Sequence, residues 1–299
     1  MKNIKLLHIG LGKCGSNFLE AFFDKVSIGM GIQKIKFNDL IDIKKIKFHY
    51  LENDSNLEKK LPQNYILSKR SLFSKRWEFN QINESFYHIK RNFSSDTAIL
   101  IILRNPYDLL NSIYLQSIQV HDCLKPDEFF YIEKNKIQRK KNKFNLYNFD
   151  YKLLVSLYKS YFKNVIIIKY ENIHKFDYLN KIFNFQNDDY EREFNNLKRN
   201  FFNRSISKTG VNFTLFLNNF INLKKFQRLI KKNITYSPNF FLKLKNRILY
   251  QFLIREFFQN KFDKIFKYKK YFIDKSCIPI DIDKMVKDYD QTDYNSIKW

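Results

Sequence analysis

Uninterrupted runs of apolar residues alternate with amphipathic stretches over the first two thirds of the chain. The apolar runs cover residues 4–9, 98–103 and 165–170, and a weaker run covers 65–68. Strands that are buried on both faces of a parallel sheet have this unbroken Ile and Leu character. Stretches with helical periodicity lie between them, around residues 17–26, 72–91, 106–119 and 150–162. The alternation predicts a three-layer α/β fold in which helices cover both faces of a parallel sheet.

The chain changes character towards its C-terminus. From about residue 201 the pattern becomes helical and rich in Phe and Leu, which predicts packing between helices. The segment 121–148 is rich in Lys and has no clear period, which predicts a loop or a lid. Because no internal repeat and no linker rich in Pro, Gly or Ser divides the chain, we expect one domain with a C-terminal helical extension.

Composition limits the class of protein. The chain has 299 residues, of which 44% are hydrophobic, so it is long enough to bury a large core and is not disordered throughout. Its three cysteines, Cys14, Cys123 and Cys277, are far apart and form neither a zinc motif nor a disulfide framework. No apolar run approaches the roughly 20 residues of a membrane helix, and the N-terminus lacks the features of a signal peptide. We therefore expect a soluble, cytoplasmic protein without a transmembrane segment.

The formal net charge of +24 is compatible with two interpretations. Lysine, asparagine, isoleucine, phenylalanine and tyrosine are all abundant, so the charge can reflect a general compositional bias and a solvated lysine surface. It can also mark a groove for a polyanion, which would make the protein a binding module without enzymatic activity. In both cases the electrostatic field favours an anionic ligand.

A glycine-containing loop between the first apolar run and the first helical stretch carries the most specific signal. It comprises Gly10, Leu11, Gly12, Lys13, Cys14, Gly15, Ser16 and Asn17. A strand that turns through glycines into a helix start directs several backbone N–H groups and the positive end of the helix dipole at one point. Lys13 adds a full positive charge, so residues 12–17 are predicted to bind a phosphate or sulfate group.

Two details refine the interpretation of this loop. Lys13 precedes the last glycine of the loop by two positions, unlike the lysine of the G-x-x-x-x-G-K-[ST] motif of ATPases. The loop is therefore predicted to bind phosphate without being ATPase-like. Cys14 is interpreted as a small residue that fills the loop, and the alternative interpretation is a nucleophile.

A second cationic position follows the second apolar run. In NTPases with a phosphate-binding loop, the second informative strand ends in an Asp that holds Mg²⁺, whereas here the strand runs into Arg104. A guanidinium in place of the acid favours an anion and makes a metal unnecessary. Ser112 lies two turns into the next predicted helix and can converge with Arg104 on one phosphate.

With both positions in view, the chain resembles the sulfotransferases that use 3′-phosphoadenosine 5′-phosphosulfate, whose fold is similar to that of the P-loop NTPases. The first motif of that family, K-x-G-[ST]-[TN], matches Lys13, Gly15, Ser16 and Asn17. The second, R-N-P-x-D-x-x-x-S-x-Y, matches Arg104, Asn105, Pro106, Asp108, Ser112 and Tyr114. Two looser matches are the strand that ends in Tyr170 and Glu171, and a basic loop with a glycine at residues 203–210. The resemblance covers residues 1–210 as a nucleotide-binding domain and leaves residues 211–299 as a helical extension packed on it.

The resemblance implies an activity and a role for the loop. The activity is the transfer of a sulfuryl group from this nucleotide, as co-substrate, to a hydroxyl of a carbohydrate or a similar metabolite. Lys13 would be the catalytic residue, because it can stabilise the negative charge that grows on the oxygen between phosphate and sulfate. Ser16 and Asn17 would orient the transferred group. Neither a metal nor a specific nucleic-acid partner is implied.

The resemblance also implies how the rest of the nucleotide is held. Arg104 and Ser112 would bind the 3′-phosphate. Lys208 and Gly210 would belong to the loop that closes over it. Tyr170 would lie near the adenine.

One departure from the family concerns the general base that an acceptor hydroxyl needs. Relatives have a His or Glu just after the strand that corresponds to residues 65–68, whereas this chain has Arg70, which cannot act as a base at neutral pH. The residues that can substitute for it are His49, Glu52, Asp54, Glu84 and His121. Lys69 and Arg70 can instead bind an anionic acceptor such as a charged glycan. The open alternatives are a homologue that binds the nucleotide without turnover and an atypical kinase with a phosphate-binding loop.

Overall fold

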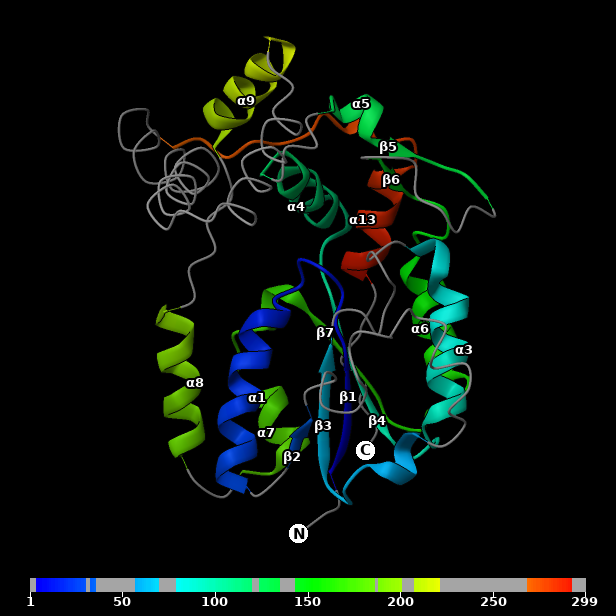
Figure 1. Cartoon of the computed structure of the whole chain (residues 1–299), viewed down its shortest axis with the longest axis vertical. Coiled ribbons are helices and arrows are strands. Elements are labelled where there is room, and N and C mark those ends of the chain that lie inside the picture. The colour runs from blue at the N-terminus through cyan, green and yellow to red at the C-terminus, as the bar shows by residue number, and fades with distance from the viewer. Residues whose placement is uncertain are drawn as a thin grey trace, which may run out of the picture.

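Strands and helices alternate along the chain in the computed structural model, which is shown in Figure 1. The described residues are 4–30, 33–35, 57–69, 79–119, 124–134, 143–185, 188–200, 207–220 and 268–291. The strands are β1 (Lys5–Ile9), β2 (Gln33–Ile35), β3 (Tyr65–Lys69), β4 (Ala98–Leu103), β5 (Phe130–Tyr131), β6 (Phe144–Asn145) and β7 (Val165–Lys169). The α-helices are α1 (Ser16–Met30), α3 (Ile82–Asn92), α4 (Pro106–Gln119), α5 (Pro126–Phe129), α6 (Tyr151–Lys159), α7 (Asp177–Phe183), α8 (Asp189–Asn200), α9 (Lys208–Phe220) and α13 (Ile282–Gln291). Short 3-10 helices are η3 (Leu57–Lys60), η5 (Phe79–Gln81), η6 (Tyr170–Asn172) and η8 (Lys275–Cys277).

The main sheet has five parallel strands in the order β2-β3-β1-β4-β7. β1 lies at its centre, with Leu6 opposite Ile66 of β3 on one side and opposite Ala98 of β4 on the other. The four strands predicted from apolar runs are confirmed, with bounds within one residue of the prediction. They form because their apolar residues are buried, as in β4, where every residue from Ile99 to Leu103 is inaccessible to solvent.

The hydrophobic pattern does not predict β2. This strand has only three residues, of which Gln33 and Lys34 are polar. Among the described strands it lies at the edge of the sheet and pairs with β3 alone. An edge strand needs burial on fewer sides than a central one, so it lacks the apolar run by which the other strands were recognised.

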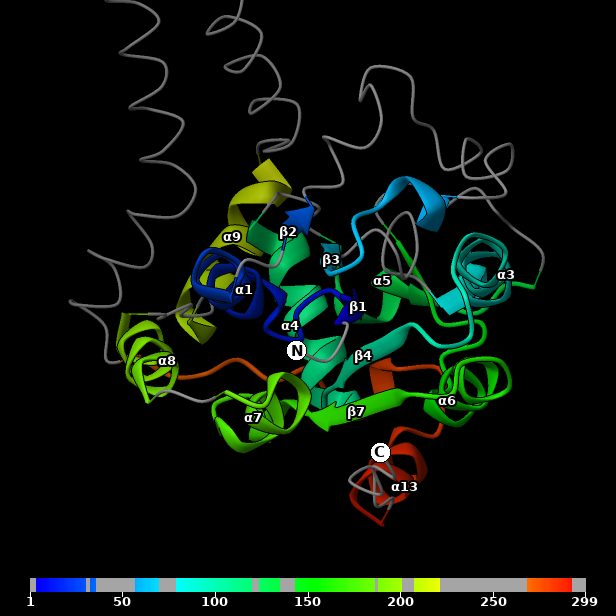
Figure 2. The ribbon, with the colours of Figure 1, turned by 90° about the horizontal axis from the view of Figure 1, so that it is seen from below.

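Helices cover both faces of the sheet, as Figure 2 shows in a view along the strands. α1 and α7 lie on one face, and α8 packs outside α1. α3 and α6 lie together on the opposite face. The predicted three-layer α/β arrangement with a parallel sheet is therefore confirmed. The predicted helix at 106–119 corresponds to α4, and the described part of the one predicted at 72–91 consists of η5 followed by α3, which starts at Ile82.

Further elements gather beyond the carboxyl-terminal ends of the strands, at the top of Figure 1. They include α4, α5, α9 and α13, of which α9 and α13 both pack on α4. The prediction of a loop at 121–148 is wrong for part of its described residues, because α5 and the two-stranded parallel sheet β5-β6 lie there. The aromatic rings of Phe129, Phe130 and Phe144 pack against each other in its core, at spacings without a regular period.

At the carboxyl-terminal end of β1 the connections between strands change from one face of the sheet to the other. The helix that follows β1, α1, lies on one face of the sheet, whereas α3, which follows the neighbouring strand β3, lies on the other. In parallel α/β sheets ligands bind where successive connections leave to opposite faces. The glycine-containing loop and Arg104 both lie at this point.

Candidate functional site

The loop between β1 and α1 turns through two residues with a left-handed backbone, Lys13 with a φ of 67° and Gly15 with a φ of 76°. The amide of Cys14 donates to the carbonyl of Leu11 at 3.3 Å, and the hydroxyl of Ser16 donates to the same carbonyl at 3.3 Å. α1 then begins at Ser16, and its first turn contains no acidic residue. The predicted arrangement of strand, loop and helix start is confirmed.

A close approach of two segments explains why residue 15 is glycine. A Cβ atom on Gly15 would lie 2.3 Å from Cδ1 of Ile173 and 3.2 Å from Cε2 of Tyr170. A side chain would therefore collide with the segment that follows β7, in addition to straining the left-handed backbone. Tyr170, which the resemblance placed near the adenine, is thus packed directly on the loop.

Arg104 connects the end of β4 to the same loop. Its Nη1 donates to the carbonyl of Lys13 at 3.0 Å, and its Cζ lies 4.7 Å from the centre of the Tyr170 ring. The hydroxyl of Tyr151 donates to the Arg104 carbonyl at 2.7 Å, which fixes the main chain there. A guanidinium has five N–H donors, and no ion pair within the described residues engages those of Arg104. Arg104 therefore contacts both the main chain of Lys13 and the ring of Tyr170.

The thiol of Cys14 is a poor nucleophile. Its side chain is fully buried, and burial raises its pKa to about 12. The charge of Arg104 lowers the pKa and that of Glu171 raises it, both by less than burial does. Because the thiol stays protonated at neutral pH, the interpretation of Cys14 as a loop-filling residue is favoured over that of a nucleophile.

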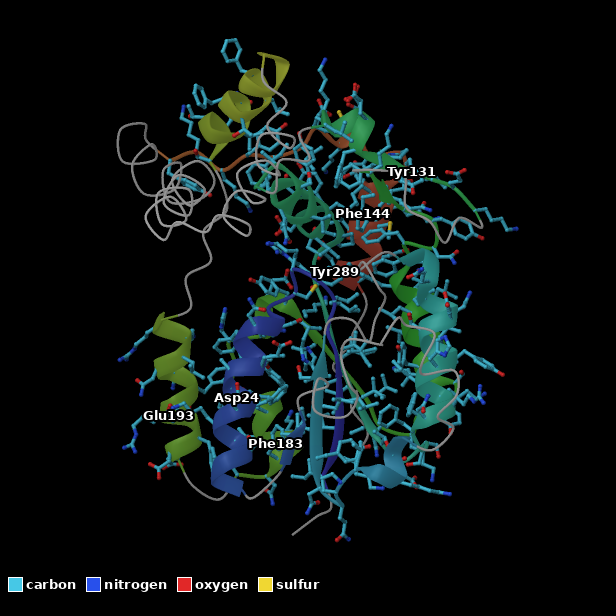
Figure 3. All side chains as sticks on the ribbon, viewed as in Figure 1. Asp24, Tyr131, Phe144, Phe183, Glu193 and Tyr289 are labelled. Carbon is cyan, nitrogen blue, oxygen red and sulfur yellow. The ribbon has the colours of Figure 1, made fainter. Side chains whose placement is uncertain are left out.

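The C-terminal helix also reaches the ends of β4 and β7. The hydroxyl of Tyr289, labelled in Figure 3, lies 2.6 Å from Oε2 of Glu171 and 3.3 Å from the carbonyl oxygen of Leu103. The ammonium of Lys169 lies 4.9 Å from the centre of the Tyr289 ring and donates to the carbonyl of Asp290 at 3.1 Å. Helix α13 is therefore seated beside the residues that flank Arg104 and Tyr170.

Several residues of the second motif have structural roles. Oδ1 of Asn105 accepts a hydrogen bond from the amide of Tyr107 at 3.1 Å, and Pro106 is the first residue of α4. This is the chemistry of a helix start. Tyr114 is fully buried and its hydroxyl donates to the carbonyl of Leu124 at 3.0 Å, so this tyrosine belongs to the core.

Three predicted residues are not joined to the loop. Ser112 is half-buried on α4, and no contact within the described residues connects it to the loop or to the guanidinium. Lys208 and Gly210 do not form a loop: this prediction is wrong, because they lie in the first turn of α9. The hydroxyl of Ser207 accepts from the Gly210 amide at 3.2 Å and so caps that helix. The preceding residues, 203–206, lie outside the described residues.

The candidates for a general base are mostly outside the described part of the chain. Those outside it are His49, Glu52, Asp54, His121 and the arginine at the expected acidic position, Arg70. Glu84 is described and lies in the first turn of α3, where its Oε1 is 3.9 Å from Nε2 of His88 on the same helix. Of Lys69 the structure describes the main chain at the end of β3.

Sequence reasoning missed the contribution of residues 268–291 to the site. The only local signal is that Ile282, Val286 and Tyr289 share one face of α13 and pack against the core, at intervals of three and four residues. Such a pattern indicates a packed amphipathic helix, but it contains no information about the surface on which the helix packs.

Comparison with known proteins adds nothing to this picture: no family model, no curated protein and no solved structure matches the chain. Within the described residues, no group of three or more His, Cys, Asp or Glu side chains is arranged to hold a metal ion. None of the described helices has both the length and the apolar character required to cross a membrane. The functional argument therefore depends on the geometry around Lys13 and Arg104.

Proposed function

We propose that the chain is a sulfotransferase with a P-loop NTPase-like fold, which transfers a sulfuryl group from 3′-phosphoadenosine 5′-phosphosulfate to a hydroxyl of a carbohydrate or a similar metabolite. The observation that carries the proposal is the 3.0 Å hydrogen bond from Arg104 to the Lys13 carbonyl. It joins Arg104, which follows β4, to the main chain of Lys13 in the loop that follows β1. A donor with phosphate groups on both its 3′ and 5′ positions needs cationic groups within the reach of a single ribose.

The loop suits the 5′ end of this donor. In the transfer, the acceptor hydroxyl oxygen forms a bond to sulfur while the bond from sulfur to the bridging phosphate oxygen breaks. The electron pair of that bond stays on the 5′-phosphate, and the hydroxyl proton passes to a base or to water. Lys13 and the amides at the start of α1 would stabilise the charge that grows on the leaving oxygen.

Arg104 suits the 3′ end. A guanidinium binds phosphate through parallel N–H donors, and the hydrogen bond to the Lys13 carbonyl engages Nη1 alone. The Tyr170 ring packs on Gly15 and lies under the guanidinium, so it offers an aromatic surface between the two cationic positions. We propose that the adenosine lies against this ring and that the product, adenosine 3′,5′-bisphosphate, is held in the same way.

A second candidate function is dinucleotide binding, because Gly10, Gly12 and Gly15 also have the spacing G-x-G-x-x-G. In the dinucleotide-binding fold the first strand lies between the second and the fourth. Here β1 lies between β3 and β4, and β2 is at the edge. The strand order therefore favours the phosphate-loop type of site over the dinucleotide type.

Calorimetric titration of the full chain separates these functions. Adenosine 3′,5′-bisphosphate is expected to bind without metal, in preference to ATP with Mg²⁺ and to NAD. Arg104→Ala should weaken that binding by about tenfold or more, as expected for the loss of a charged phosphate contact. Lys163→Ala is the matched control, since it also removes one positive charge but from an exposed ion pair with Asp96. Mg²⁺-dependent binding of ATP, or binding of NAD, would overturn the proposal.

Transfer is tested separately from binding. Radiolabelled donor is incubated with neutral and with anionic sugars, and the labelled products are separated from the donor. Incorporation into a sugar supports the sulfotransferase. Binding of the bisphosphate without transfer to any of these acceptors would identify a homologue that binds the nucleotide without turnover.

A further inference from the structure

We propose that helix α13 is a positioning element of the anion site and that Tyr289 is its positioning residue. Through Leu103 and Glu171, the hydroxyl of Tyr289 would fix the main chain that presents Arg104 and Tyr170 to the loop. The part of this inference that concerns nucleotide affinity rests on the proposed function. The part that concerns the order of the loop does not.

The Tyr289 hydroxyl contacts two residues that are direct sequence neighbours of Arg104 and Tyr170. Leu103, whose carbonyl oxygen is 3.3 Å from the hydroxyl, directly precedes Arg104. Glu171, whose Oε2 is 2.6 Å away, directly follows Tyr170. A hydroxyl has one proton, so the short contact with the carboxylate is the stronger bond and the carbonyl shares the same donor. Tyr289 is 3% exposed, so water does not readily replace either contact.

Lys169 strengthens the attachment of the helix. Its ammonium is 4.9 Å from the centre of the Tyr289 ring and donates to the carbonyl of Asp290 at 3.1 Å, near the end of α13. A cation at that end of a helix satisfies a carbonyl and complements the helix dipole. An exposed ion pair at 2.9 Å joins Asp288 of α13 to Lys152 of α6.

The segment that precedes α13 is hydrogen-bonded to α4, the helix that begins shortly after Arg104. Nδ2 of Asn111 donates to the carbonyl of Tyr271 at 2.9 Å, and its Oδ1 accepts from the Ile273 amide at 3.1 Å. The hydroxyl of Tyr107 donates to the Ile273 carbonyl. Residues 268–291 are therefore bonded both to the strand that ends before Arg104 and to the helix that starts after it. This arrangement is the reason to assign them a positioning role.

Tyr289→Phe is the sharpest variant, because it keeps the ring with its contacts to Tyr151 and Lys169 and removes the hydroxyl alone. Tyr161→Phe is a matched control: it removes a hydroxyl that donates to the carbonyl of Phe93 at 3.3 Å, before the amino-terminal end of β4, whereas the loop lies at the opposite edge of the sheet. Asp288→Asn controls for a change on α13 that spares the strand ends.

The first measurement needs no nucleotide. Cys14 is a fully buried residue of the loop itself, so the rate of its alkylation, followed by mass spectrometry of its peptide, reports local opening of the loop. Tyr289→Phe is expected to raise this rate by about tenfold over wild type, the size expected for one lost buried hydrogen bond, and by more than Tyr161→Phe does. A rate equal to that of the two controls would overturn the proposal, whatever the ligand of the site is.

The second measurement is the affinity for adenosine 3′,5′-bisphosphate. If the wild type binds it, Tyr289→Phe should weaken binding several-fold and raise the KM for the donor more than it lowers kcat, whereas both controls should bind like the wild type. Unchanged affinity and KM in Tyr289→Phe would overturn the positioning role. If the wild type does not bind the nucleotide, the proposed function fails, and the alkylation rates still decide whether α13 orders the loop.

Discussion

Nη1 of Arg104 donates a 3.0 Å hydrogen bond to the main-chain carbonyl of Lys13, across a separation of 91 residues. The contact is possible because β1 and β4 are neighbours in the sheet and end at the same edge. It couples the anion-binding loop to the second cationic position. Changes at either residue are therefore expected to affect ligand binding at the other.

Lys13→Ala should lower turnover by about 10²- to 10³-fold and change the affinity for adenosine 3′,5′-bisphosphate only a few-fold. The physical reason is that the leaving oxygen gains its negative charge in the transition state, whereas Arg104 and the loop amides still hold the bound nucleotide. Steady-state kinetics and calorimetry together check this. Lys13→Arg retains the charge and should recover part of the turnover. Equal losses of turnover and affinity would mean that Lys13 serves binding alone.

Gly15→Ala should destabilise the protein by about 1–3 kcal/mol, because it combines a φ of 76° with a contact of 2.3 Å to Cδ1 of Ile173. Ile173→Val removes that Cδ1 atom at a cost of about 0.5–1.5 kcal/mol. The double variant should lose less free energy of unfolding than the sum of the two single losses, since the collision is gone. Urea denaturation of the four proteins provides the cycle. Strict additivity would show that backbone strain alone is responsible.

The stability of the protein should fall as the pH drops from 6.5 towards 3. His8 in β1 is fully buried, with Nδ1 2.7 Å from Oγ of Ser68, and burial lowers its pKa to about 3. The unfolded histidine binds a proton near pH 6.5 and the folded one does not, so this residue removes up to about 1.4 kcal/mol of stability per pH unit in that window.

His8→Gln isolates this contribution, because glutamine can still bond to Ser68 and does not titrate. Denaturation at pH 7 and pH 5 should show a smaller loss of stability in the variant than in the wild type. Part of the change of stability with pH should remain in the variant, since burial and the charge of Lys198 also lower the pKa of His174. Identical slopes in both proteins would contradict the assignment to His8.

Glu58 ties the amino-terminal ends of β1 and β4 together. Its carboxylate accepts from the Ser94 amide at 2.6 Å and from the Lys5 ammonium at 3.0 Å. Burial raises the pKa of Glu58, and the hydrogen bonds from Ser94 and Lys5 more than offset this, so the pKa is lowered from its ordinary value of 4.5. The stabilisation is therefore present above pH 4.5 and is lost as the pH falls through the folded pKa.

Glu58→Gln should cost about 1–3 kcal/mol at pH 7 and progressively less below pH 4.5, as measured by urea denaturation. Asp96→Asn is the matched control: this carboxylate forms an exposed ion pair with Lys163, which solvent screens, and should contribute little to stability. Equal effects of the two substitutions would mean that the partly buried hydrogen bonds of Glu58 stabilise the protein no more than a surface ion pair does.

The sequence predictions were correct where the signal came from neighbouring residues of the chain. The apolar runs predicted β1, β3, β4 and β7 because a strand that is buried on both faces consists of consecutive apolar residues. The start of α4 could be predicted because Asn105 and Pro106 act on their own helix. At Lys208 and Gly210 a loose motif match suggested a loop, but the hydroxyl of Ser207 and the packing of α9 on α4 make this a helix start.

The sequence by itself therefore determined the parallel α/β sheet, the glycine-containing loop and the identity of Lys13 and Arg104 as cationic residues at strand ends. Only the tertiary structure decided that these two residues touch, that Tyr170 packs on Gly15, and that Tyr289 bonds to Glu171. The physical reason is that strand order and the docking of a distant helix arise from long-range packing, which no short stretch of sequence encodes.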